Sequence, residues 1–92
     1  MWHVYIIKCN DNSFYVGLTN NLERRLIEHQ TGTGAQYTSA RQPAILEYSE
    51  SFMCRKDAER REKQLKSWSR AKKEALINGN LIRLQELSRR KS

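Results

Sequence analysis

The sequence lacks the features that mark membrane-spanning and disulfide-bonded proteins. No apolar run approaches the roughly 18 residues that a membrane-spanning helix needs, and no signal peptide opens the chain. The two cysteines, Cys9 and Cys54, have no C-x-x-C spacing, and Cys9 lies in a strand pattern where a reduced, buried thiol is expected. There is also no internal repeat or low-complexity segment. We therefore expect a cytoplasmic protein that makes no membrane contact and needs no disulfide.

Acidic residues are also in short supply. Against 10 aspartates and glutamates, 17 lysines and arginines give a net charge of +7. The surplus is concentrated between residues 55 and 73, where nine basic and three acidic residues give +6. Such a region predicts a polyanionic partner, with nucleic acid favoured over membrane. The alternative is a helical face that only water contacts.

Three segments have the composition of β-strands. Residues 2–9 are β-branched and aromatic, and they are apolar on both faces, as in a central strand that is covered on both sides. Turn-forming residues 10–13 then lead into a second strand, Phe14–Leu18, which predicts an antiparallel hairpin. Pro43 precedes a third predicted strand, Ala44–Tyr48, because proline is tolerated at the start of a strand.

Capping residues and glycines predict where the helices begin and end. Asn20 or Asn21 can cap a first helix that reaches about Gln30 and stops before Gly32. The other predicted helices cover residues 55–66, residues 70–78 between a Ser69 cap and Gly79, and the segment after an Asn80 cap. Residues 35–42 are predicted to form a polar loop.

These elements predict one α/β domain with a small, three-stranded, mainly antiparallel sheet that is flanked by helices. Ninety-two residues suffice for a single modest core without disulfide support. The domain spans residues 1–92. Its core covers about residues 2–78, and a C-terminal helix with a basic tail covers residues 80–92.

Both principal helices place polar side chains on the stripe that should face the core. In the first helix, Arg25 and His29 share the inner stripe with two leucines, Leu22 and Leu26. In the second, Glu62 lies on the same face as Ala58 and Leu65. An inward carboxylate costs free energy unless it is paired or bound to a metal. The structural alternative is an Arg25–Glu62 ion pair between the helices.

Tyr5 and Tyr15 lie in the two strands of the predicted hairpin. Tyrosine in a strand usually serves packing. If the two tyrosines instead share a functional site, both rings must lie on the same face of the sheet. If Asn10 pairs with Phe14, the tyrosines share a face; if Cys9 pairs with Phe14, they lie on opposite faces. A shared site therefore requires an even sum of the paired residue numbers, which the first register satisfies.

Taken in order, these residues resemble the GIY-YIG nuclease family. The resemblance rests on Val4-Tyr5-Ile6, Tyr15-Val16-Gly17, Thr19, Asn21-Leu22, Arg24-Arg25-Leu26, Glu28-His29, Gly34-Ala35-Gln36-Tyr37-Thr38, Arg41-Gln42-Pro43 and Glu62. It spans about residues 4–77 and is strongest to the small stand-alone bacterial members. A more distant similarity is to the catalytic domain of structure-specific nucleases that cut branched DNA. The first motif has His3 in place of its glycine, and the second has Val16 in place of isoleucine.

The resemblance implies hydrolysis of phosphodiester bonds with one Mg²⁺ or Mn²⁺ ion. Glu62 would be the protein ligand of a largely hydrated ion. Arg25 would neutralise charge on the phosphate oxygens, and Tyr5 would activate water with the help of Tyr15 and His29. Gly17 would have a structural role.

The expected function is thus a metal-dependent DNA endonuclease, acting in DNA repair or on branched DNA. DNA is favoured over RNA as the partner, and a monomer is favoured. The predicted nucleic-acid-binding residues are Arg41, Arg61, Lys66, Arg70, Lys72 and Lys73. One alternative is a catalytically inactive nucleic-acid-binding protein that retains the nuclease fold. Another is a protein-interaction adaptor.

Overall fold

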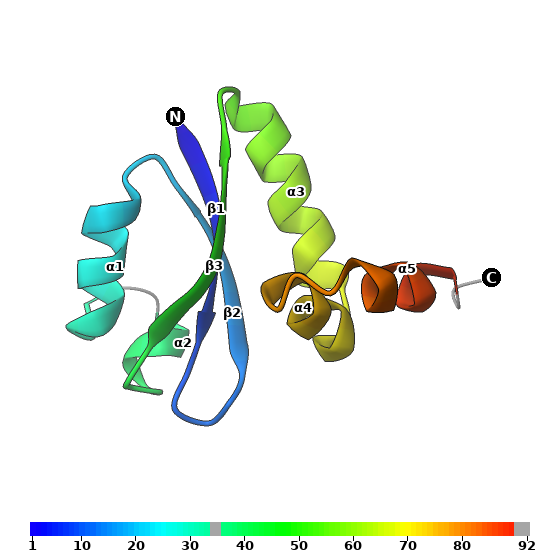
Figure 1. The fold of residues 1–92 in the computed structure, drawn as a ribbon. Helices are drawn as coiled ribbons and strands as arrows, with labels where there is room; N and C mark the ends of the chain where they lie inside the picture. Colours follow the sequence, from blue (N-terminus) through cyan, green and yellow to red (C-terminus); the bar gives the residue numbers. More distant parts are fainter. Residues whose placement is uncertain (34–35, 90–92) are drawn as a thin grey trace.

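A three-stranded antiparallel sheet lies between two layers of helices (Figure 1). The structure is a computed structural model that describes residues 1–33 and 36–89. Its elements are β1 (Trp2–Lys8), β2 (Phe14–Thr19), α1 (Leu22–Gln30), α2 (Gln36–Ser39), β3 (Ile45–Phe52), α3 (Arg55–Ser67), α4 (Arg70–Ile77) and α5 (Leu81–Arg89). This architecture confirms the predicted α/β class. Residues 34–35 of the family-like motif and residues 90–92 of the basic tail lie outside the described residues.

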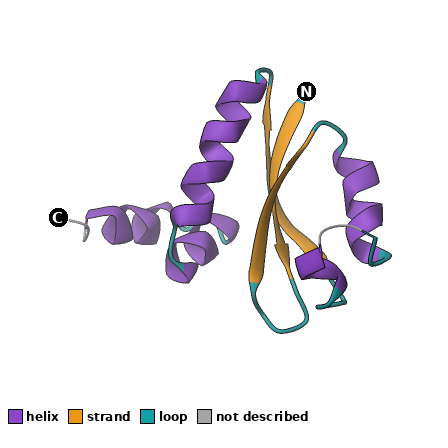
Figure 2. Ribbon diagram, turned by 180° about the vertical axis from the view of Figure 1, so that it is seen from behind, coloured by secondary structure: helices purple, strands orange, loops and turns teal. Residues whose placement is uncertain are grey.

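The first strand is the centre of the sheet, whose strand order is β2-β1-β3. Residues 4–7 of β1 are all at most 1% exposed, which confirms the prediction of a strand covered on both sides. Helices α1 and α2 lie on one side of the sheet, and α3 and α4 lie on the other (Figure 2). Because β1 is central, strand β2, which carries Gly17, is an edge strand of the sheet.

Each face of the sheet has its own apolar core. On the α3 side, Val4 and Ile6 pack with Val16, Ala58 and Leu65. On the α1 side, a smaller cluster contains Tyr5, Ile7, Cys9 and Ala44, and partly buried residues of α1 and β2 pack against it. Side chains of a strand alternate between the two faces, so the odd-numbered residues of β1 are those that face α1. A tyrosine is thus built into the core on which the α1 layer rests.

The hairpin has the predicted parity but a different register. Phe14 pairs with Lys8, two residues away from the Asn10 pairing that was considered from the sequence. Next to this pair, the Cys9 N–H donates to the Ser13 carbonyl at 2.9 Å and closes the connection. Asn12 turns the chain with a φ of +70°. Because the shift is even, Tyr5 and Tyr15 still lie on one face, as the shared-site hypothesis requires.

Two other predicted segments differ in extent or type. Strand β3 continues to Phe52, whereas the sequence predicted its end at Tyr48. Its exposed residues alternate with partly buried ones, and the strand pairs along the whole of β1, so pairing decided its length. The predicted loop at residues 35–42 contains the short helix α2.

The helix ends follow the predicted caps. The Asn21 side chain accepts the Arg24 N–H at 3.1 Å, and the Asn80 side chain accepts the Arg83 N–H at the same distance. The Ser69 hydroxyl accepts the Lys72 N–H at 3.3 Å. Helix α5 packs on α4 and extends away from the sheet (Figure 1). None of the helices described here is long and apolar enough to cross a membrane.

Candidate active site

Tyr5 lies at the centre of the site because its ring packs across the edge strand at Gly17. The two residues are directly opposite each other in the hairpin. A Cβ atom at Gly17 would lie 2.3 Å from both Cζ and the hydroxyl oxygen of Tyr5. The absence of a side chain at Gly17 is therefore what allows the phenol ring to occupy this position.

Helix α1 brings Arg25 and His29 to the same ring. They are one turn apart, and the helix presents both toward β1, so that His29 is fully buried and Arg25 partly buried. The Tyr5 hydroxyl lies 3.0 Å from Nε2 of His29, and Nε of Arg25 donates to the same oxygen at 3.4 Å. The predicted inner stripe of the first helix is thereby confirmed.

Burial keeps this group of side chains uncharged, apart from the guanidinium. Desolvation is the main cause that raises the pKa of Tyr5, and the hydrogen bond from Arg25 opposes it. Desolvation and then the charge of Arg25 lower the pKa of His29. The hydrogen bond to Tyr5, followed by that to Glu28, raises the pKa of Arg25. At neutral pH the site thus holds a phenol, a neutral imidazole and an arginine cation.

Tyr15 completes an aromatic cluster around the imidazole. Its ring centroid lies 5.3 Å from that of His29 and 6.5 Å from that of Tyr5. The centroids of Tyr5 and His29 are 5.6 Å apart, in an edge-to-face arrangement that aromatic rings favour. The structure therefore brings together four of the five residues predicted for the reaction.

The fifth, Glu62, lies on α3, on the other side of the sheet. Its partner is Lys66 at 3.2 Å, whereas Arg25 pairs with Glu28 at 3.0 Å, so the Arg25–Glu62 ion pair considered from the sequence is not formed. Burial is the main cause that raises the pKa of Tyr5, and the negative charge of Glu62 adds to it from across the edge strand. Glu62 thus does not contact the phenol, and its charge is the smallest of the causes that shift the pKa of Tyr5.

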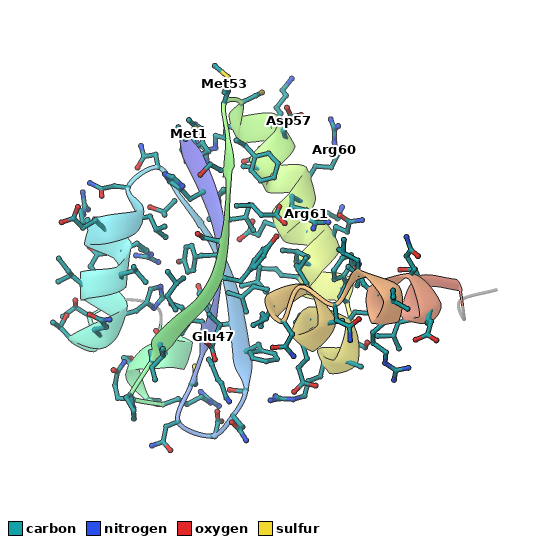
Figure 3. All side chains as sticks on the ribbon, in the orientation of Figure 1. Met1, Glu47, Met53, Asp57, Arg60 and Arg61 are labelled. Atoms are coloured by element: carbon teal, nitrogen blue, oxygen red, sulfur yellow. The ribbon has the colours of Figure 1, made fainter. Side chains whose placement is uncertain are left out.

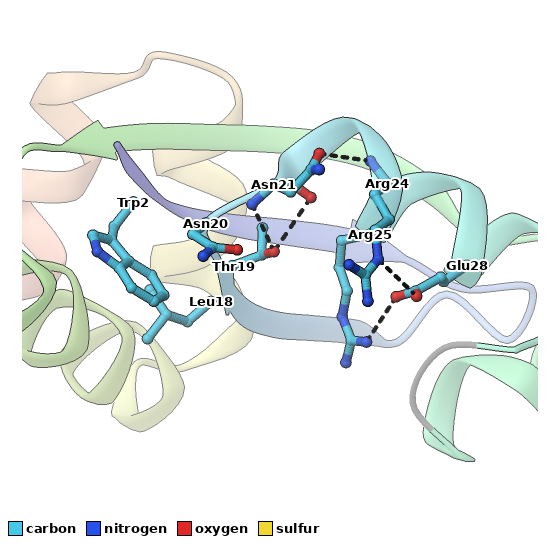
Figure 4. Close-up of a pocket in the computed structure, with 8 residues that line it drawn as sticks. All are labelled: Trp2, Leu18, Thr19, Asn20, Asn21, Arg24, Arg25 and Glu28. Atoms are coloured by element: carbon cyan, nitrogen blue, oxygen red, sulfur yellow. Dashed lines mark hydrogen bonds and ion pairs between the residues drawn. The ribbon is translucent and has the colours of Figure 1, made fainter.

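A depression of about 260 Å³ opens beside Arg25 at the end of β2 (Figure 4). Trp2 and Leu18 lie at one end of it, and Arg25 and Glu28 lie at the other. Polar side chains between them come from the segment that caps α1: Thr19, Asn20 and Asn21. The depression combines an apolar end with a guanidinium, which suits a phosphate that carries a flat organic group.

The predicted metal ligand is a single carboxylate. Within the described part of the chain, no three His, Cys, Asp or Glu side chains are grouped to hold a metal ion. The Glu62 side chain is 21% exposed, and its partner Lys66 is a surface residue of the same helix. One accessible carboxylate suits Mg²⁺, which keeps most of its waters, and does not suit a metal that demands several protein ligands.

The predicted nucleic-acid-binding residues fall into two groups. Arg61 is held by both Glu50 oxygens, at 3.0 and 2.9 Å, and Lys72 is buried with its ammonium 4.6 Å from the Trp68 ring centroid. Of the others, Lys66 and Arg70 are exposed, and Arg41 and Lys73 are half-buried. Figure 3 shows Asp57 and Arg60 on the outer side of α3, where both are exposed.

Three residues of the site received no role from the sequence. Glu28 orients Arg25, Thr38 contacts Nδ1 of His29 at 2.6 Å, and the Gln42 amide donates to the carbonyls of both His29 and Thr38. Glu28 could have been found from its i+3 spacing to Arg25. Thr38 and Gln42 lie in the segment predicted as a loop, so no periodicity indicated them.

Known proteins are similar to this chain over most of its length. The GIY-YIG catalytic domain matches residues 1–75. A UPF0213 protein of Halobacterium salinarum is 49% identical over 84% of this chain and all of its own length. A UPF0213 protein of Staphylococcus haemolyticus is 47% identical over 82% of this chain and 92% of its own.

Two solved structures are also similar to this chain. The solution structure of a UPF0213 protein from Bacillus halodurans is 40% identical, with a TM-score of 0.56 over 85% of this chain and 84% of that one. A protein of E. faecalis is 38% identical, with a TM-score of 0.58 over 87% and 85% of the two chains. The chain therefore belongs to the GIY-YIG nuclease family and carries its catalytic domain.

Proposed function

We propose that this protein is a metal-dependent endonuclease that hydrolyses phosphodiester bonds in DNA, with branched or repair-associated DNA as its substrate. The observation that carries the proposal is the Tyr5 hydroxyl, which is held between Arg25 and His29 next to a depression with a basic wall. Membership of a nuclease family, whose members generally depend on a divalent metal, supports it.

Arg25 binds the scissile phosphate. Its guanidinium lines the depression, and Glu28 fixes one edge of it through Nη1. A planar guanidinium with its remaining N–H groups directed at the phosphate can stabilise the charge that grows on the phosphate oxygens. Trp2 and Leu18, at the other end, would then contact a neighbouring sugar or base.

Tyr5 acts as the base that takes a proton from the attacking water. A phenol of ordinary pKa near 10 needs help at neutral pH, and its burial here raises that pKa further. The Arg25 hydrogen bond favours the phenolate, and His29 lies within reach of the phenolic proton. Tyr15 packs against His29 and limits the motion of its ring.

Glu62 would hold the divalent ion, which supplies a positive charge to the phosphate and the leaving oxygen. Burial is the main cause that raises the pKa of Tyr5, and a cation at Glu62 would offset the smaller contribution of that carboxylate. The surface residues Arg41, Lys66, Arg70 and Lys73 would guide the DNA backbone toward the site, so binding should weaken as salt increases.

The test is cleavage of duplex and branched DNA, and of RNA of matched sequence, by the purified full chain with Mg²⁺, Mn²⁺ or EDTA. We expect metal-dependent cleavage that falls by at least ~100-fold in Arg25→Ala, comparable to the loss of a key electrostatic contact. Glu62→Gln should lose both cleavage and Mn²⁺ binding. Arg60→Ala, which removes an exposed arginine with an 80% exposed side chain, is the matched control and should cleave normally.

Unchanged cleavage in Arg25→Ala and Glu62→Gln would refute this site. Salt-dependent DNA binding with no cleavage under any metal, and indifferent to Glu62→Gln, would instead establish the inactive nucleic-acid-binding alternative. If the protein shows no salt-sensitive affinity for nucleic acid, a protein-interaction role would be favoured.

A further inference from the structure

Thr38 contacts His29 on the buried side of the site. It lies on the short helix α2, is completely buried, and places Oγ1 at 2.6 Å from Nδ1 of His29. The other ring nitrogen, Nε2, lies 3.0 Å from the Tyr5 hydroxyl. The imidazole therefore links a threonine, which is out of reach of substrate, to the proposed base.

The direction of these hydrogen bonds follows from the donors available. The Tyr5 hydroxyl has two hydrogen-bond partners among the described residues, Arg25 and His29, and arginine only donates. The phenolic proton must therefore be given to Nε2 of His29. A neutral imidazole carries one proton, so that proton is on Nδ1 and is donated to Thr38.

Gln42 keeps this arrangement in place. Its side-chain amide donates to the Thr38 carbonyl at 2.8 Å and also to the His29 carbonyl. The end of α1 is thus tied directly to α2. Thr38 has little freedom to move away from the imidazole, and the hydrogen bond between them is maintained by the backbone rather than by the two side chains alone.

We propose that Thr38 is a positioning residue that holds His29 in its Nδ1–H tautomer, so that Nε2 keeps a lone pair for the proton of Tyr5. The inference rests on the proposed nuclease function. In this step the O–H bond of Tyr5 breaks and an N–H bond forms at Nε2, which leaves phenolate and imidazolium. Nδ1–H stays bonded to Thr38 in both states. The phenolate then takes the proton of the attacking water, and His29 returns its extra proton through the Tyr5 hydroxyl when the product leaves.

The test compares Thr38→Val, which removes the hydroxyl at constant shape, with Thr38→Ser, which keeps it. The imidazole ¹⁵N shifts of the free full-length protein report the tautomer at neutral pH. Wild type and Thr38→Ser should show Nδ1–H. In Thr38→Val, Nδ1–H would be buried without its acceptor, so the tautomer ratio should shift toward Nε2–H by about tenfold, or ~1.4 kcal/mol.

Cleavage provides the second readout. Thr38→Val should lower kcat by about tenfold with little change in KM, and Thr38→Ser should restore it. An Nε2–H tautomer in wild type, or an unchanged tautomer in Thr38→Val, would overturn the inference. Absence of cleavage by wild type would overturn the proposed function, and with it the catalytic role of Thr38. Because the tautomer is measured without substrate, the two failures are distinguishable.

Discussion

Gly17 is the position at which the structure makes its sharpest prediction. In Gly17→Ala the new Cβ would lie 2.3 Å from Cζ and from the hydroxyl oxygen of Tyr5, whereas ordinary van der Waals contact begins at 3.4 Å. The ring or the edge strand must therefore move by about 1.1 Å, the difference between these distances. A shift of this size would lengthen the hydrogen bond from Tyr5 to His29, now 3.0 Å, beyond a useful range.

The cost of this substitution has two parts. Overpacking a well-filled core typically destabilises by about 1–3 kcal/mol. A buried hydroxyl that loses its partners adds about 1–3 kcal/mol. We therefore expect Gly17→Ala to lower the free energy of unfolding by about 2–6 kcal/mol, a large share of the ~5–15 kcal/mol of a typical domain.

The measurement is urea unfolding followed by circular dichroism, together with cleavage of DNA under conditions where the variant remains folded. Gly79→Ala is the matched control, because Gly79 has a φ of +69° and no atom within 4 Å of an added Cβ. Backbone strain there should cost about 1 kcal/mol and leave the site intact. In a Tyr5→Leu background, Gly17→Ala should be far less costly. A loss below ~0.5 kcal/mol in the otherwise wild-type chain would refute the argument that Gly17 makes room for the phenol.

Three further predictions follow from the contacts of single residues. Arg25→Lys keeps the charge but loses the planar guanidinium that reaches both Tyr5 and Glu28. Cleavage should therefore fall by about 10–100-fold, ~1.4–2.7 kcal/mol, with unchanged circular dichroism. Activity near wild type would contradict a bidentate role of Arg25. Burial lowers the pKa of His29 below 6.5, so the unfolded chain takes up a proton first as the pH falls. This contribution to stability should be present above about pH 6.5 and be lost as the pH falls toward the folded-state pKa. Between about pH 7.5 and 5, the free energy of unfolding should therefore depend less steeply on pH in His29→Gln than in the wild type; equal slopes would contradict this prediction. Arg61→Met leaves the partly buried Glu50 carboxylate without its Arg61 partner. The unfolding temperature should fall, and the loss in free energy of unfolding should be about 1–3 kcal/mol, while cleavage at saturating DNA stays normal. A loss of cleavage without a loss of stability would instead support direct contact of Arg61 with DNA.

The contacts of Arg61 show why a count of charges did not locate a binding surface. The sequence places nine basic residues between positions 55 and 73, and periodicity alone treats them as one positive face. In the structure, Arg61 pairs with Glu50 of β3 and stacks 5.1 Å from the Trp68 ring centroid, while Lys72 covers the same ring. These partners come from segments that no helical pattern connects, so burial of the basic side chains was decided by tertiary packing.

The sequence by itself determined the local elements and the faces of the helices. The apolar stripe of the first helix placed Arg25 and His29 inward, and a cap at Asn20 or Asn21 together with Gly32 bounded the helix, because helical periodicity and capping depend on neighbours within a few residues. The two-sided apolar pattern of residues 4–7 likewise placed β1 at the centre of the sheet.

Tertiary structure decided what depends on distant segments. It set the hairpin register at Lys8–Phe14, extended β3 to Phe52 through pairing with β1, and folded part of a predicted loop into α2. It also brought Thr38 against His29 and left Glu62 across the edge strand from Tyr5. A site assembled from both strands of a hairpin and from the helices α1 and α2 is a non-local arrangement. Its residue types can be read from the sequence, but their distances arise only when the layers pack.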